Sequence, residues 1–296
     1  MSVELRVRPL TLFVLVFSSI VLLGGCSSKT TVQSDPDSEE WLSLFDGQSL
    51  EGWTPKVRGF EYGEDPKHTF RVENGAITVS YSEYDTFNEQ FGHLFYKDPF
   101  SFYKMRVEYR FTGDQAEGGP GWAFRNSGIM IHSPPGSSML KDQDFPISIE
   151  VQLLGGNGVD DRTNSNLCTP GTNVVMDNEL VTRHCVNSTS KTYHGDNWVT
   201  AEIVVLGDSL ITHYLEGEDV LHYNQPQIGG GSVDGFDPAF KEDGKLLTGG
   251  YFSLQSESHP VEFRRVELLN LEGCMDPKAT NYKSYFVSDN PTSCTY

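Results

Sequence analysis

A strict alternation of polar and aliphatic side chains runs through residues 148–153 and constrains the fold of this chain more than any other feature. The polar members are Ser148, Glu150 and Gln152, and the aliphatic members are Ile149, Val151 and Leu153. Successive side chains of a β-strand point to opposite faces of a sheet, so the pattern predicts a strand with one buried and one polar face. A preceding strand-like segment carries Asn126 and His132 and is joined to this strand by a Pro/Gly-rich loop. We therefore predict that the two strands form the floor of a site for a polar ligand.

Strands dominate the rest of the chain as well. Residues 105–111 alternate between large apolar and charged side chains, which predicts another strand with one buried face. Short apolar segments are separated by turn signals such as Asn74-Gly75 and Gly207-Asp208. No segment shows a sustained helical period with caps. This organisation is typical of an all-β sandwich.

The net charge argues against one class of partner. The formal net charge is -19 and the sequence pI is about 4.7. Proteins that bind nucleic acid hold its phosphates with a basic surface, and this composition offers none. We therefore expect no nucleic-acid partner.

The N-terminal residues are predicted to be an export signal rather than part of the fold. Arg6 and Arg8 precede an apolar run over residues 10–23, which is the layout of a signal peptide. The run ends in Leu-Gly-Gly-Cys26, which resembles a bacterial lipobox, with an ordinary signal peptide as the alternative. We expect residues 1–25 to be removed, Cys26 to carry a lipid that anchors the protein to a membrane, and residues 26–40 to form a flexible tether. Ser27 after the cysteine favours the outer membrane.

Four cysteines remain for disulfides in the oxidising compartment that an export signal implies. They are Cys168, Cys185, Cys274 and Cys294. Four cysteines allow three pairings, and proximity in the sequence favours 168–185 and 274–294. A metal site built from them is disfavoured because no Cys-x-x-Cys spacing is present.

Several motifs in a fixed order resemble one known family. Residues 44–53 agree in full with its opening pattern L-F-[DN]-G-x-[ST]-L-x-G-W, and residues 126–129, 148–154, 166–171 and 254–264 follow. The chain resembles the family once called domain of unknown function 1080, described as 3-keto-glycoside lyases, hydratases or 3-keto-disaccharide hydrolases. The resemblance implies a concanavalin A-like jelly roll of two antiparallel sheets over residues 41–271. Residues 272–296 resemble a small Cys-bounded module of bacterial surface proteins, which we predict to be a disulfide-stapled cap.

The resemblance also implies a chemistry. A sugar oxidised to a ketone at C3 has an acidic proton at C2, and its removal allows elimination of the C1 substituent, after which water can add. We predict Glu150 as the base and Glu257 or His132 as the second proton-transfer group, a role that His259 could also fill. The predicted substrate-binding residues are Trp122, Asn126, Gln152, Gln255, His259 and Arg264.

Structural roles compete with each of these assignments. Glu150 could form an ion pair with Arg125 or Arg264, and Arg264 could brace the sheet. Trp122 could be buried instead of stacking on a sugar. A divalent metal held by Glu150, His132 or Glu257 stays open, and we commit to no cofactor.

Two other functions remain as alternatives to a 3-keto-glycoside enzyme. The first is a non-catalytic carbohydrate-binding module at the cell surface, which would tolerate loss of Glu150. The second is a conventional glycosidase, which needs two carboxylates. The Glu150-x-Gln152 pattern breaks the series of alternating acids found in related jelly-roll glucanases, so we disfavour it.

Overall fold

The computed structural model describes residues 35–296. The predicted signal peptide, the predicted lipid site Cys26 and the first part of the predicted tether lie outside this range. The helices of the described residues are short 3-10 turns: η1 (Gly121–Ala123), η2 (Gly136–Ser138), η3 (Pro238–Phe240) and η4 (Pro291–Ser293). None of the helical segments in residues 35–296 has the length and apolar composition that a membrane crossing requires.

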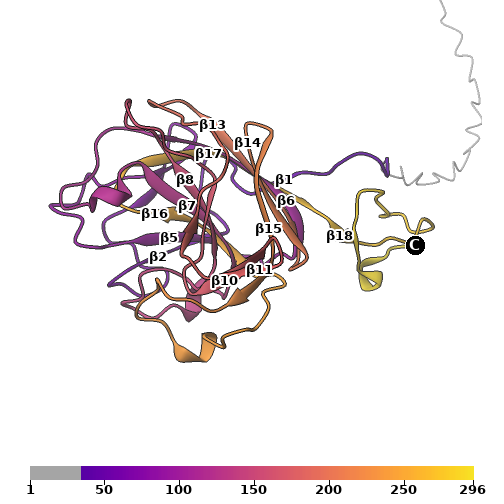
Figure 1. Ribbon diagram of the computed structural model, residues 1–296. Coiled ribbons are helices and arrows are strands. Elements are labelled where there is room, and N and C mark those ends of the chain that lie inside the picture. The colour runs from indigo at the N-terminus through magenta and orange to yellow at the C-terminus, as the bar shows by residue number, and fades with distance from the viewer. Residues whose placement is uncertain (1–34) are drawn as a thin grey trace, which may run out of the picture. The chain divides into compact units, whose positions relative to one another are not determined.

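A ten-stranded antiparallel sheet forms one layer of the fold (Figure 1). Its strands, in spatial order, are β11 (Glu179–Val181), β10 (Thr172–Met176), β15 (Glu218–Ile228), β14 (Leu210–Leu215), β13 (Val199–Leu206), β6 (Phe102–Phe111), β17 (Val261–Asn270), β4 (Ala76–Val79) and β3 (Phe70–Glu73), with β1 (Leu42–Ser43) paired to β17. Strands β13, β14 and β15 follow one another as a meander. By contrast, β6 lies between β13 and β17, so the centre of this sheet is built from segments far apart in the sequence.

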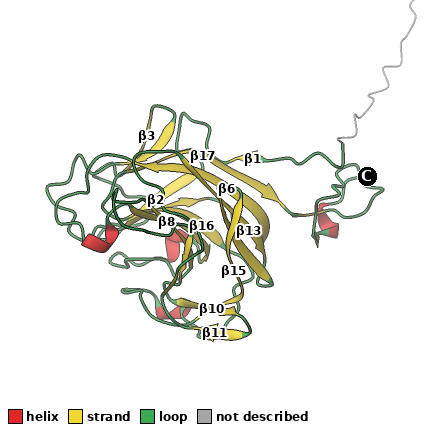
Figure 2. Cartoon of the chain, turned by 45° about the horizontal axis from the view of Figure 1, so that its top comes forward, coloured by secondary structure: helices red, strands yellow, loops and turns green. Residues whose placement is uncertain are grey.

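A seven-stranded antiparallel sheet forms the second layer (Figure 2). Its spatial order is β12 (Cys185–Val186), β9 (Asn166–Cys168), β8 (Ile149–Leu154), β7 (Asn126–Ser133), β16 (Tyr251–Ser256), β5 (Gly92–Tyr96) and β2 (Trp53–Val57). The two predicted strands of the ligand floor, β7 and β8, are neighbours near the centre of this sheet. The two layers confirm the predicted all-β sandwich of antiparallel sheets.

The apolar faces of the two sheets meet in one core. Ile129, Val151 and Leu254 of the seven-stranded sheet are fully buried, as are Met105 and Val107 of the ten-stranded sheet. Both predicted alternations, over residues 148–153 and 105–111, are confirmed by this burial. Each such side chain contributes about 1.5–3 kcal/mol relative to exposure, so the core fixes which face of each strand remains free.

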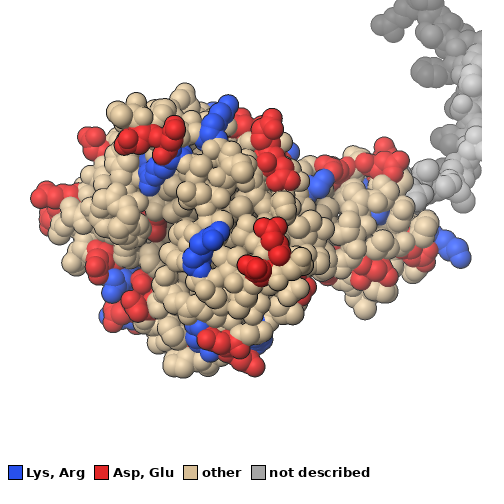
Figure 3. Space-filling view, viewed as in Figure 1, with Lys and Arg blue, Asp and Glu red and all other residues tan. Residues whose placement is uncertain are grey.

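The outward face of the ten-stranded sheet carries ion pairs between adjacent strands. Arg106 of β6 lies 3.0 Å from Glu202 of β13, and Arg110 of β6 lies 2.7 Å from Glu262 of β17. Figure 3 shows acidic side chains over the visible face of the molecule with lysines and arginines scattered among them. Solvent-accessible pairs on a protein surface contribute about 0–1 kcal/mol each.

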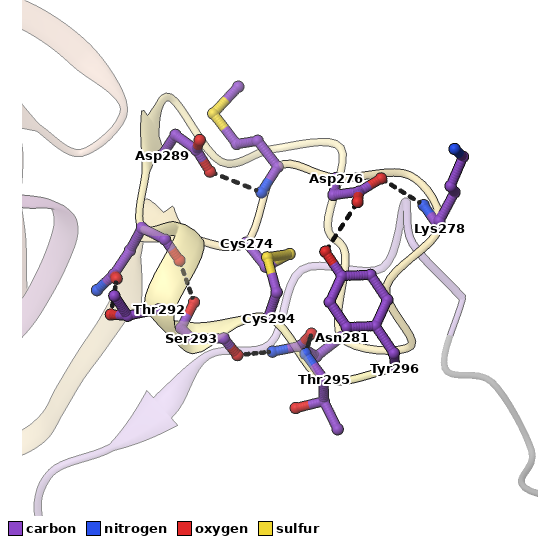
Figure 4. Close-up of a disulfide and its surroundings, with 12 residues drawn as sticks. Cys274, Asp276, Lys278, Asn281, Asp289, Thr292, Ser293, Cys294, Thr295 and Tyr296 are labelled. Carbon is purple, nitrogen blue, oxygen red and sulfur yellow. Dashed lines mark hydrogen bonds between the residues drawn. A yellow bond between two sulfur atoms is a disulfide. The ribbon is translucent and has the colours of Figure 1, made fainter.

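Both predicted disulfides are confirmed. Cys168–Cys185 joins β9 to β12, and Cys274–Cys294 closes the C-terminal segment (Figure 4). In that segment β18 (Glu272–Gly273) pairs in parallel with β19 (Ser288–Asp289). Side chains add to the staple: Asp276 accepts hydrogen bonds from the Lys278 amide at 3.0 Å and the Tyr296 hydroxyl at 2.9 Å.

The described end of the predicted tether contacts this C-terminal segment. The Ser284 amide donates to the Pro36 carbonyl at 3.0 Å, and the Glu40 amide donates to the Tyr285 hydroxyl at 3.4 Å. Lys283 forms an ion pair with Glu40. Residues 35–40 are therefore held by the C-terminal segment, in addition to leading into β1.

Ile129→Ala tests the assignment of the core face. Ile129 is fully buried on β7, so its truncation leaves a cavity between the sheets. We expect the free energy of unfolding, measured by urea denaturation, to fall by about 2–5 kcal/mol. Val204→Ala on the half-buried outward face of β13 is the matched control and should cost less than about 1 kcal/mol. Equal losses in the two variants would contradict the assigned faces.

Candidate active site

A pocket of about 420 Å³ opens on the face of the seven-stranded sheet that points away from the core. Its floor includes Glu150 and Gln152 of β8, which flank the core residue Val151. Gly128 of β7 lies directly opposite Gln152 in the antiparallel register. The pocket thus lies on the polar face that the alternation of residues 148–153 predicts.

Five predicted site residues line this pocket: Trp122, Asn126, Glu150, Gln152 and Glu257. They come from η1, β7, β8 and the turn that follows β16, so the fold gathers segments more than one hundred residues apart. Asp144 and Asp234, from two loops, add carboxylates that the sequence analysis did not single out. No sequence signal marks these two, because each lies in a loop without a period or a motif.

Two buried carboxyls distinguish the pocket. Glu150 and Glu257 are only 5% and 3% exposed. Burial raises the pKa of Glu150. Burial also raises the pKa of Glu257, the charge of Glu150 raises it further, and the charge of Arg162 opposes the rise. Carboxyls that interact in this way titrate as a pair, so at neutral pH the pair retains a proton and can both accept and donate one.

Several buried polar atoms around the carboxyls have no hydrogen-bond partner among residues 35–296. They are Oδ1 of Asn126, Oε2 of Glu257, and both Oε1 and Nε2 of Gln255. Gln255 is fully buried and Asn126 is 3% exposed. Leaving a buried polar group unpaired costs about 1–3 kcal/mol. A ligand with several hydroxyl or carbonyl groups would relieve that cost, which is the chemistry of a sugar.

Gly128 creates the space in which Glu150 and Gln255 approach each other. A Cβ at this position would lie 2.8 Å from both Cγ and Oε1 of Glu150 and 3.0 Å from Oε1 of Gln255. Contacts this short do not occur in folded proteins, so a side chain here would displace the carboxyl, the amide or both. The absent side chain therefore sets the position of Glu150.

His93 is a buried neighbour of Gln255 in the strand register that the sequence analysis missed. It lies on β5 directly opposite Gln255 of β16. Burial lowers the pKa of His93 to about 3, so the ring is neutral. Its Nε2 donates to the Asp144 carbonyl at 3.1 Å, which leaves Nδ1 as an unpaired acceptor. The sequence offers no sign of this pairing, because the register between β5 and β16 joins residues 162 positions apart.

Aromatic rings form one wall of the pocket. Trp122 is 55% exposed, so the alternative that it is buried in the core is wrong. Its ring stacks on Phe91, with centroids 5.9 Å apart and an interplanar angle of 18°. The ring of Phe91 in turn packs on that of Phe145, another residue of the pocket wall, with centroids 4.9 Å apart. An exposed indole backed by aromatic rings is the kind of platform on which sugar rings stack.

The Cys168–Cys185 disulfide also forms part of the pocket lining. Cys168 lies directly opposite Glu150 in the register of β8 and β9. Potential metal-ligating atoms of Cys168, His184 and Cys185 lie within 4.8 Å of one another. The two sulfurs are bonded to each other and are therefore not thiolates, so this group does not suit a transition metal.

His132 lies apart from the two glutamates. The pairing of β7 with β16 contains an irregularity next to this residue, and its backbone φ is 57°. The side chain is buried, and its Nε2 donates to the Gly207 carbonyl at 3.1 Å. Burial lowers its pKa to about 4. A cation site that combines His132 with Glu150 and Glu257 is therefore not formed.

His259 and Arg264 also lie outside the lining of the pocket. His259 is buried between the rings of Phe111 and Phe124, at centroid distances of 5.8 and 5.1 Å. Arg264 is on the outward face of the ten-stranded sheet, where it pairs with Glu108 at 2.5 Å. The bulge between Phe263 and Arg265 in the pairing of β17 with β6 accompanies this placement. The bracing role considered for Arg264 thus matches its position better than substrate binding does.

Arg125 does not pair with Glu150 either. Its guanidinium donates to the Gly195 carbonyl at 2.6 Å and to Asp196 at 2.8 Å. Arg162, which the sequence analysis did not consider, is the cation whose charge acts on Glu257. It donates to the carbonyls of Trp122 at 3.2 Å and Gly155 at 3.0 Å, and so ties the aromatic wall to the end of β8.

Gly128→Ala tests whether this glycine positions the carboxyl. The added methyl group would clash with Glu150 and Gln255, so we expect a loss of catalytic activity of about 100-fold or more. The cost in stability should be only about 1–3 kcal/mol, as for other overpacked sites. Gly231→Ala is the control, because a Cβ at that position meets no atom within 4 Å. Unchanged activity in Gly128→Ala would remove Gly128 from the site.

Glu257→Gln tests the raised pKa of the buried pair through stability. The folded protein holds the proton of the Glu257 carboxyl more tightly than the unfolded chain does, because the pKa of Glu257 is raised in the fold. The native state therefore loses stability as the pH rises from the ordinary pKa of a glutamate toward this raised pKa. The amide cannot ionise. We expect the free energy of unfolding of the variant to exceed that of the native protein by about 1.4 kcal/mol or more at about pH 8 and by little at about pH 4.

Urea denaturation at the two pH values measures the difference. Glu202→Gln, on the outward face of the ten-stranded sheet, controls for the substitution itself. The same stability difference for Glu257→Gln at both pH values would mean that the carboxyl titrates normally.

Comparison with known proteins identifies a family. No protein with a curated function matches the chain. Similar solved structures include a candidate glycosyl hydrolase from Parabacteroides distasonis (16% identity, TM-score 0.46, covering 78% of this chain and 94% of that chain). Another is a carbohydrate-binding module from Bacillus subtilis (10% identity, TM-score 0.41, covering 74% of this chain and 96% of that chain). A third is LamA of Z. galactanivorans in complex with laminaritriose and laminaritetraose (10% identity, TM-score 0.43, covering 74% of this chain and 92% of that chain).

The family match covers most of the described chain. Residues 40–269 match the 3-keto-alpha-glucoside-1,2-lyase-like domain. These residues contain both sheets apart from Asn270, the last residue of β17, and every residue of the pocket. The match supports a carbohydrate-related function and agrees with the resemblance seen in the sequence motifs. The chain therefore belongs to the family of 3-keto-alpha-glucoside-1,2-lyase-like domains.

Proposed function

We propose that the protein is an enzyme that cleaves or hydrates 3-keto-glycosides in the pocket of Glu150 and Glu257. One observation carries this proposal: two buried carboxyls lie in one pocket, and next to them side-chain amide atoms of Asn126 and Gln255 have no hydrogen-bond partner among residues 35–296. Family membership supports the carbohydrate class of the substrate. The chemistry needs one group that accepts a proton and another that donates one, and a coupled pair provides both.

In the proposed elimination, each glutamate transfers one proton. Glu150, as the carboxylate, takes the proton from C2, whose acidity comes from the ketone at C3. The C2–H electrons form a C1=C2 double bond, and the C1–O bond breaks. Glu257, as the carboxylic acid, gives its proton to the leaving oxygen. The products are an alcohol and a 2-hydroxy-3-keto-glucal, and the pair still holds one proton, now on Glu150.

Hydration uses the same pair in the opposite direction. Glu257, now a carboxylate, takes a proton from water while the oxygen of that water adds to C1. Glu150 returns a proton to C2. The sum of the two steps is hydrolysis of the glycosidic bond. The Nε2 donors of Gln152 and Gln255 would stabilise the charge that develops on the C3 oxygen. Gln255 is suited to this role because its amide has no partner among the described residues.

We also propose that the enzyme is held at the cell envelope by a lipid anchor on Cys26. The support is the Leu-Gly-Gly-Cys26 sequence after an apolar run. The two disulfides of the folded chain add support, because disulfides persist in oxidising compartments outside the cytoplasm.

Turnover of a 3-keto-disaccharide and of its unoxidised parent tests the proposed reaction. We expect the native protein to cleave only the keto form, with release of sugar and the absorbance of an unsaturated ketone. Glu150→Gln should reduce this activity by about 100-fold to 10,000-fold, because the amide cannot accept the C2 proton. Glu202→Gln, on the opposite sheet, should keep full activity.

The other outcomes discriminate among functions. Cleavage of the unoxidised sugar alone would indicate a conventional glycosidase. Sugar binding without turnover of either compound would indicate a carbohydrate-binding module, for which the exposed Trp122 is suited. Turnover of the keto form that survives Glu150→Gln would keep the reaction but remove Glu150 as its base.

A further inference from the structure

We propose that a second groove, on the other side of Trp122, binds the leaving group of the substrate, and that this leaving group is an uncharged or basic sugar. This inference rests on the proposed function and extends it. The groove has a volume of about 330 Å³. Its lining includes Trp122, Phe124, Asn157, Asp160, Asp161 and Arg162.

Trp122 connects the groove to the catalytic pocket. It lines both cavities, and 55% of its surface is exposed. One substrate can therefore contact the indole while it occupies both spaces. The stacking on Phe91 and the hydrogen bond from Arg162 to the Trp122 carbonyl hold the residue in place. A fixed aromatic platform between two polar cavities suits two consecutive sugar rings.

Arg162 places the groove on the side of the general acid. Its guanidinium lines the groove, and its charge acts on Glu257. Glu150 instead leans over Gly128 toward Gln255, in the floor of the sheet. A sugar whose C2 lies at Glu150 thus has its C1 substituent directed to Glu257 and on toward Trp122. This arrangement supports the roles of Glu150 as base and Glu257 as acid.

The groove is rich in hydrogen-bond acceptors. Asp160 and Asp161 are exposed carboxylates on the loop after β8. Asn157 orders this loop, because its Oδ1 accepts from the amides of Val159 and Asp160 at 3.0 and 2.9 Å. Its Nδ2 donates to Asp160 at 2.7 Å. Carboxylates accept hydrogen bonds from sugar hydroxyls or ammonium groups and repel other carboxylates.

The catalytic pocket has the same sign of charge. Asp144 and Asp234 line it together with the two glutamates. Arg162, the cation in the lining of the groove, already donates to four backbone carbonyls, those of Trp122, Phe124, Arg125 and Gly155. Carboxylates in both cavities would therefore repel an anionic leaving group such as a uronic acid. They would not repel neutral or basic sugars.

Steady-state kinetics on three 3-keto-glucosides test the groove. Their leaving groups are methanol, glucose and glucuronic acid, so only the last two reach beyond the catalytic pocket. For the native protein we expect the lowest KM with glucose as leaving group. For Asp161→Asn we expect KM to rise about 10-fold with glucose, with kcat unchanged, and to stay within about twofold with methanol. In the same variant, the difference in KM between the glucuronic acid compound and the glucose compound should become smaller.

Trp122→Ala provides a second measure, and Leu180→Ala is its control because Leu180 is an exposed apolar residue of the other sheet. Trp122→Ala should raise KM more for the glucose compound than for the methyl compound. The assignment of the groove would be overturned if Asp161→Asn and Trp122→Ala each changed KM equally for the glucose and methyl compounds. A preference of the native protein for the glucuronic acid compound would also overturn it. Failure of the native protein to convert any of the three would instead refute the proposed function.

Discussion

Burial of aliphatic side chains between the two sheets is the constraint on which the rest of the structure depends. It commits Ile129, Val151 and Leu254 to the core and thereby directs their neighbours Glu150, Gln152 and Gln255 to the opposite face. A slip of one residue in the register of β8 would exchange the two sets and bury the carboxyl between the sheets. The same hydrophobic free energy that folds the chain therefore orients its candidate catalytic groups.

The core also supports a site that is unfavourable by itself. Two carboxyls are taken out of water side by side, and amide groups next to them lack partners among residues 35–296. Each of these features costs free energy in the unliganded protein. They persist because the surrounding sheet, the aromatic wall and the Cys168–Cys185 disulfide fix the backbone around them. A site that is strained without ligand and satisfied by one is what selective binding of a polar substrate requires.

The loops add selectivity to the chemistry of the sheet. The floor on β7, β8 and β16 supplies the proton-transfer pair, while η1 and the loop after β8 supply Trp122, Asp161 and Arg162. Arg162 links the two parts, since it binds carbonyls at the base of the aromatic wall and also lowers the proton affinity of Glu257. In the proposed reaction the floor would act on C1, C2 and C3 of one sugar, and the loops would select what is attached to it.

Local patterns in the sequence determined the strands, their buried faces and most of the pocket floor. The period of two in residues 148–153 indicated that Glu150 and Gln152 share a face, and proximity indicated both disulfides. Only the tertiary structure decided which strands are neighbours, because pairing energies act between segments far apart in the chain. That is why His93 opposite Gln255 and Arg162 beside Glu257 were missed. It is also why His132, turned by an irregularity in the pairing of β7 with β16, was expected in a pocket that it does not line.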